Sequence, residues 1–173
     1  NVFVSFLNKF CTGYWSISDP LNGYTAIKVQ TYKILDQGKL AKKYDFEVSM
    51  FNALSLVDAK VGDVFIPAIY RDEVSHANLV KDTFRVMRCL IKGFFRRMFI
   101  KRMLFNMSLV PIYYIAGLLL LLWSLVYGAW VISITLGIPS ASAGTVLLAV
   151  ISFLLGVQFV LQAITLDIYS EPK

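Results

Sequence analysis

The last third of the chain is apolar almost without interruption. No Asp, Glu, Lys, Arg or His occurs from Ser108 to Leu166, and a helix needs about 20 apolar residues to cross a bilayer. The pattern predicts a transmembrane hairpin over 108–167, with spanning helices at about 109–135 and 145–166 and a Gly/Ser-rich turn between them. Gln158 and Gln162 lie one helical turn apart in the second helix. They predict either a hydrogen bond between the two helices or a contact with a lipid headgroup or another subunit.

Residues 81–107 form a second pattern, in which basic and apolar residues fall on separate stripes of one helix. Eight basic residues stand there against Asp82 alone. The apolar stripe includes Phe84, Ile91 and Phe95. This composition predicts a juxtamembrane helix lying on an anionic membrane surface, although a helix that covers a soluble core has the same pattern. The candidate membrane-surface residues are Arg85, Arg88, Lys92, Arg96 and Arg97.

Residues 1–80 have ordinary polarity and alternate between helical and extended patterns. Helices are predicted over 1–12, over a short stretch from about 31 to 35, and over 46–59, where Asp45 is the expected cap. Strands are predicted over 24–29 and 61–70. We therefore expect the α/β fold class for this region.

Composition narrows the possible classes of protein. The chain is 57% hydrophobic and 16% charged, with a net charge of +6, which excludes a purely soluble protein, a disordered chain and a collagen-like chain. Two cysteines are too few for a disulfide scaffold. Because basic residues crowd one flank of the hairpin, residues 1–107 and the tail 168–173 are expected on the cytoplasmic side of an inner or plasma membrane. The helical pattern that begins at Asn1 suggests the interior of a longer sequence.

Three segments together resemble the C-terminal half of a family 2 glycosyltransferase, in the group of dolichol-phosphate mannosyltransferase-like enzymes that charge a polyprenyl phosphate with a sugar. They are Asp19-Pro20-Leu21-Asn22-Gly23-Tyr24, Tyr44-Asp45-Phe46-Glu47, and the stretch from Val64 to Ser75. The resemblance implies that 1–80 is the acceptor-side part of a GT-A domain. It also implies amphipathic interface helices and a membrane hairpin in the order observed here.

The resemblance also assigns roles to residues. Asp19 is placed nearest the reacting centre, as a base or an orienting carboxylate, although an Asp before Pro also caps turns. The acceptor and phosphate-binding positions are Asn22, Gly23, Lys28, Arg71, Glu73 and Ser75. Thr25 and His76 depart from residues common in relatives, which leaves the phosphate site less well defined.

The implied function is transfer of a sugar from a nucleotide sugar to a polyprenyl phosphate at the cytoplasmic membrane face, in cell-envelope glycan synthesis. The implied partners are both substrates and an anionic bilayer, with room for a homo-oligomer and no role for nucleic acid. A divalent cation, Mg²⁺ or Mn²⁺, is expected in the complete enzyme, but the Asp-x-Asp motif that binds it is missing here. This chain alone is therefore expected to be inactive. The alternative is a non-catalytic module that anchors to the membrane or binds a lipid phosphate. A channel subunit is disfavoured because neither span holds an ionisable residue.

Overall fold

The computed structural model describes residues 2–43, 45–66, 79–136 and 141–172. These residues are mostly helical and divide into two compact units. Unit 1 comprises Asn1–Lys101 with Ser170–Lys173, and unit 2 comprises Arg102–Tyr169.

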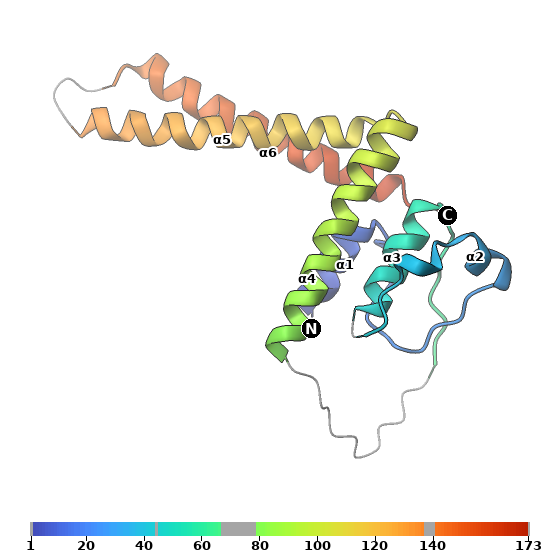
Figure 1. Ribbon diagram of the computed structural model, residues 1–173. Coiled ribbons are helices and arrows are strands. Elements are labelled where there is room, and N and C mark those ends of the chain that lie inside the picture. Colours follow the sequence, from blue (N-terminus) through green and yellow to red (C-terminus); the bar gives the residue numbers. More distant parts are fainter. Residues whose placement is uncertain (1, 44, 67–78, 137–140, 173) are drawn as a thin grey trace. The chain divides into compact units, whose positions relative to one another are not determined.

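Unit 1 is built on three helices that pack against one another: α1 (Val2–Thr12), α3 (Phe46–Leu56) and α4 (Leu79–Phe95) (Figure 1). The short helix α2 (Val29–Ile34) and a 3-10 turn, η1 (Gln37–Lys39), lie between α1 and α3 in the sequence. The helix that the sequence predicts at 1–12 is present, and the one predicted at 46–59 begins as expected but ends at Leu56. Asp45 precedes α3 as expected, but its side chain makes no capping hydrogen bond.

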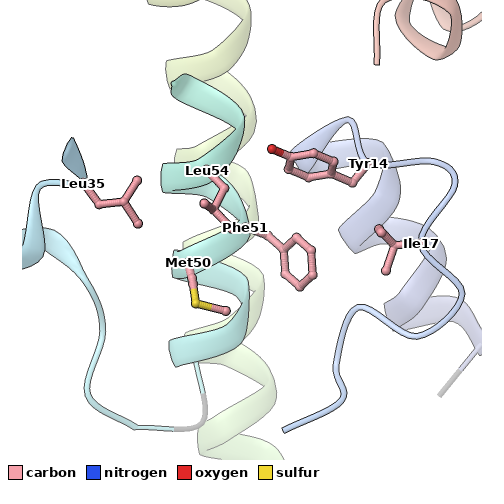
Figure 2. Packing of buried hydrophobic residues seen from close by; sticks show 6 residues of the cluster. All are labelled: Tyr14, Ile17, Leu35, Met50, Phe51 and Leu54. Carbon is pink, nitrogen blue, oxygen red and sulfur yellow. The ribbon is translucent and has the colours of Figure 1, made fainter. Parts of the chain in front are cut away.

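The larger part of the core of unit 1 surrounds one face of α3 (Figure 2). Its buried members are Tyr14, Ile17, Leu35, Met50, Phe51 and Leu54. The rings of Tyr14 and Phe51 meet edge to face, with 5.7 Å between their centroids. The Tyr14 hydroxyl donates a 2.6 Å hydrogen bond to the Ala59 carbonyl, which ties the segment after α3 to the segment after α1.

A second cluster fills the space where α1, α3 and α4 meet. Cys11, Val48 and Leu90 form its buried centre, and the rings of Phe10 and Phe94 stack at 5.3 Å beside it. One face of α4 therefore packs against the core of unit 1. Burying apolar area of this kind supplies most of the free energy that holds the three helices together.

The prediction of an α/β, GT-A-like domain is wrong for this structure, because the described residues contain no strand or sheet. Residues 24–28 and 61–66 have no regular structure. Val61 packs against the core cluster, but most of the other apolar side chains are exposed, with Phe65 94% exposed. A sequence that favours a strand forms one only where another strand supplies its hydrogen-bond partners. Residues 67–70, the remainder of the second predicted strand, lie outside the described residues.

The helix that begins as α4 continues as a π-helix, η2 (Arg96–Phe105). The sequence pattern predicts one helix over 81–107, and in the structure its geometry changes from α to π at Arg96. The segment closes where Met107 takes a positive φ of 45° and the Ser108 amide donates to the Arg102 carbonyl at 2.8 Å.

Unit 2 contains two 27-residue helices, α5 (Leu109–Thr135) and α6 (Ala143–Tyr169), which run side by side (Figure 1). By length and composition both are capable of crossing a membrane. Ser108 caps α5 by accepting from the Val110 amide at 3.3 Å, and Pro111 occupies the first turn, where its missing amide proton costs nothing.

Glycine permits the close approach of α5 and α6. A β-carbon on Gly117 would lie 3.0 Å from the Gly156 carbonyl oxygen, and one on Gly156 would lie 3.0 Å from the Leu121 backbone nitrogen. Ser124, Ser152 and Ala163 are also buried on the facing sides. Small residues at such positions let two apolar helices pack backbone to backbone.

Candidate functional site

The exposed face of α4 and η2 combines basic and aromatic side chains. Arg88, Lys92 and Arg96 recur every four residues and are exposed. Phe84 and Phe95, on the adjoining stripe, are 73% and 52% exposed. A helix that presents large apolar side chains beside cations suits the boundary between lipid headgroups and acyl chains. Arg85, another of the predicted membrane-surface residues, is half-buried, and its side chain interacts with another group of the protein.

Arg97, the fifth predicted membrane-surface residue, has a different position. Its side chain is buried, and its Nε and Nη2 donate to the carbonyls of Cys11 and Phe10 at 3.0 and 2.9 Å. These carbonyls belong to the last turn of α1. The last carbonyls of a helix have no hydrogen-bond donor within the helix and carry negative partial charge. Arg97 therefore caps α1 inside unit 1.

Lys101 does the same for α3. Its Nζ donates to the Ser55 carbonyl near the end of that helix and pairs with Asp58 at 2.5 Å. Asp58 has a positive φ of 53°, typical of a residue just beyond a helix C-terminus. Two of the basic residues in 81–107 thus serve the fold of unit 1.

Arg102 forms an ion pair within unit 2. Its Nη2 lies 2.7 Å from Oδ1 of Asp167, in the last turns of α6. The Asp167 side chain is fully buried and that of Arg102 is 10% exposed. Because this pair joins the segment before α5 to the end of α6, it closes the hairpin at its open end. The predicted second span stops before Asp167, but α6 continues through it to Tyr169.

The turn that contains Asp19 is exposed and held by local hydrogen bonds. The Asp19 carboxylate accepts from the Leu21 amide at 3.2 Å, and the Asn22 side-chain oxygen accepts from the Tyr24 amide at 3.0 Å. This geometry places Asp19, Asn22 and the exposed Gly23 in one loop, and it is also what a structural turn requires.

The loop is anchored by a carboxylate that the sequence did not single out. Asp63 accepts a 2.6 Å hydrogen bond from the Ser18 amide, next to Asp19. No motif marks Asp63, since its partner is a backbone group 45 residues away. The structure thus brings a second carboxylate to the Asp19 loop.

Of the other predicted acceptor residues, Lys28 alone lies in the part of the chain that the structure describes. Lys28 is exposed and directly precedes α2. Arg71, Glu73 and Ser75 lie outside the described residues. The predicted phosphate site therefore stays a prediction.

Two buried groups of unit 1 have altered acidity. Burial raises the pKa of the Cys11 thiol to about 11, an effect that the Arg97 guanidinium partly opposes. Burial, together with the negative charges of Asp58 and Glu171, also raises the pKa of the Tyr14 hydroxyl. Since the thiolate is the reactive form of cysteine, Cys11 is inert at neutral pH and has a packing role.

The C-terminal tail belongs to unit 1. The Glu171 carboxylate accepts hydrogen bonds from the Ser16 amide at 3.1 Å and from its hydroxyl at 2.6 Å. The residues before η2 and those after α6 therefore form one compact unit.

Among the described residues, no group of three or more His, Cys, Asp and Glu side chains could hold a metal ion. Comparisons with protein-family models, with curated proteins and with solved structures gave no match.

Proposed function

We propose that this chain is the acceptor-side, membrane-anchoring part of a glycosyltransferase that moves a sugar from a nucleotide sugar to a polyprenyl phosphate at the cytoplasmic membrane face. The observation that carries the proposal is the basic and aromatic face of α4, exposed in unit 1 and followed in the sequence by two helices that are apolar enough to span a bilayer.

In this proposal α5 and α6 cross the membrane as a hairpin, and unit 1 is cytoplasmic. The hydrogen bonds between Glu171 and Ser16 support it, because they keep both ends of the hairpin with one compact unit. The basic residues near the start of α5 support the cytoplasmic assignment through the positive-inside rule. The aromatic residues Phe84 and Phe95 then enter the headgroup layer, and the neighbouring cations attract phosphate.

The transferase chemistry rests on the resemblance around Asp19. A polyprenyl phosphate is already an anion, so transfer to it needs positioning and charge neutralisation more than a strong base. Asp19 acts in this proposal as an orienting carboxylate in an exposed loop. The non-catalytic module remains the second candidate, because the hydrogen bond from the Leu21 amide already gives the Asp19 carboxylate a structural role.

The lipid part of the proposal is tested by binding a short-chain polyprenyl phosphate to the full chain in neutral nanodiscs. The triple variant Arg88→Gln/Lys92→Gln/Arg96→Gln removes three exposed cations from α4. At about 1 kcal/mol for each cation near a membrane surface, the Kd should rise on the order of a hundredfold.

The matched control removes three exposed lysines elsewhere in unit 1, Lys33→Gln/Lys42→Gln/Lys43→Gln. It changes the net charge equally and should leave the Kd within about threefold. If both triple variants raised the Kd equally, binding would depend on the net charge of unit 1 and not on the α4 cations, which would contradict the proposal.

The catalytic part is tested in membranes that contain the complete gene product, with labelled nucleotide sugars and polyprenyl phosphate. Asp19→Asn should lower transfer strongly while lipid binding persists, and Asp36→Asn, a carboxylate change outside the loop, should not. Full activity in Asp19→Asn would remove that residue from the mechanism. Binding without transfer for any sugar would establish the non-catalytic module instead.

A further inference from the structure

The outward face of α6 carries two polar side chains that the hairpin itself does not use. Gln158 and Gln162 are both exposed, and neither amide has a hydrogen-bond partner within the described part of the chain. The hydroxyl groups of Ser124, Ser152 and Thr165, by contrast, each donate to a carbonyl of their own helix. The hydrogen bond between α5 and α6 that the sequence allowed for this pair is therefore not formed.

The direction of the two glutamines follows from helix geometry. Gly156 marks the side of α6 that contacts α5. At ~100° per residue, Gln158 and Gln162 lie about 200° and 240° around the helix from it, on the opposite side. They belong to a row with alternating spacings of three and four residues, as along the seam between two helices. Its members, all exposed, are Leu148, Ile151, Leu155, Gln158, Gln162 and Thr165.

Gln158 and Gln162 lie deep enough in the bilayer that leaving their amides without hydrogen-bond partners costs free energy. Gly156 is the midpoint of α6. With a rise of about 1.5 Å per residue, Gln158 lies about 3 Å and Gln162 about 9 Å from it, within the ~15 Å half-thickness of the hydrocarbon core. Neither water nor a headgroup reaches Gln158 there, so its amide must find a partner in another protein helix.

We infer that this face of α6 binds the same face of a second copy of the chain. A side-chain amide has both donor and acceptor groups, so two glutamines pair with each other. Copies inserted with the same topology are parallel, and a two-fold axis along the membrane normal sets Gln158 opposite Gln158 and Gln162 opposite Gln162. The surrounding leucine and isoleucine side chains complete the contact. This inference rests on the membrane insertion in the proposed function and does not depend on the sugar-transfer chemistry.

The experiment uses the full chain in liposomes, labelled at the N-terminus with a donor or an acceptor fluorophore. Resistance to alkaline extraction is measured first, and its absence would refute the membrane insertion on which both proposals depend. Energy transfer is then followed as the chain is diluted with lipid. Gln158→Leu/Gln162→Leu should weaken association on the order of tenfold, as expected for losing two interhelical amide pairs. The conservative Gln158→Asn/Gln162→Asn should retain part of it.

Ser133→Ala is the matched control, because it removes an exposed polar group whose hydrogen bond lies within its own helix. It should associate like the wild type. Geometry is checked by oxidation, which should cross-link Gln158→Cys but not Val150→Cys, about 100° from the centre of the row. A wild-type chain that inserts but stays monomeric would overturn the inference and leave this face to lipid or to a different protein. Undiminished association of the leucine variant would also overturn it.

Discussion

Replacing Gly13 with alanine should destabilise unit 1. Gly13 follows α1 with a positive φ of 82°, and its amide donates to the Lys9 carbonyl at 2.8 Å. An added β-carbon would lie 2.4 Å from Nη1 of Arg97. The substitution therefore strains the backbone and displaces the guanidinium that caps α1.

The expected loss follows from these two effects. A left-handed conformation costs an L-residue about 1–2 kcal/mol, and a hydrogen bond to a charged group contributes about 1.5–3 kcal/mol. If Arg97 keeps one of its two carbonyl partners, the free energy of unfolding falls by about 3 kcal/mol, which is roughly a hundredfold in the opening equilibrium. Gly62→Ala is the matched control, because nothing lies within 4 Å of the added atom.

Cys11 provides the assay. It is buried next to the affected contact, so its thiol reacts with a maleimide only when α1 separates from its neighbours. Mass spectrometry resolves its labelling from that of Cys89. In Gly13→Ala the labelling rate of Cys11 should rise roughly a hundredfold, in proportion to the opening equilibrium constant. A rate within threefold of that of Gly62→Ala would refute the role assigned to Arg97.

Three further predictions concern single contacts. Arg102→Leu or Asp167→Leu alone should lower the free energy of unfolding of unit 2 by about 3–5 kcal/mol, because each leaves a buried charge without its ion-pair partner. The double variant should recover most of this loss. Additive losses of the two single variants in denaturant titrations would contradict the prediction. Tyr14→Phe removes the hydrogen bond to Ala59 and should cost about 1 kcal/mol in the same titrations, and no measurable loss would show that this bond is dispensable. The pKa of Cys11 is raised in the folded state from 9.0 to about 11, so as the pH rises the thiol loses its proton first in the unfolded state. The free energy of unfolding is therefore unaffected below pH 9. It falls by about 1.4 kcal/mol per pH unit as the pH rises towards 11. Cys11→Ala should flatten that slope, and an unchanged slope would assign it to other groups such as Tyr14.

The helices could be predicted from the sequence because their signals are local. The charge-free run sets α5 within its predicted bounds, and α6 extends past its predicted end because the Arg102 side chain compensates the charge of Asp167. The strands could not be predicted this way. Residues 24–29 and 61–66 have strand-like side chains, but a sheet depends on partners distant in sequence.

The candidate site was predictable only in part, for a similar reason. A helical wheel places Lys81, Arg85, Arg88, Lys92 and Arg96 on one stripe and Arg97 and Lys101 away from it. It cannot tell that these two residues meet the ends of other helices. Arg97 and Lys101 reach carbonyls more than 40 residues away, and no local pattern identifies such partners. Asp63 was missed because it acts on a backbone amide.

The ion pair between Arg102 and Asp167 also has a consequence for biosynthesis. Arg102 leaves the ribosome roughly 65 residues before Asp167, which at about 5–20 residues per second is an interval of roughly 3 to 13 s. During the second half of that interval α5 is complete, but Arg102 does not yet have Asp167 as its ion-pair partner. A chain that stops within α6 therefore lacks this contact, and an unfinished hairpin differs from a finished one in the surroundings of one arginine.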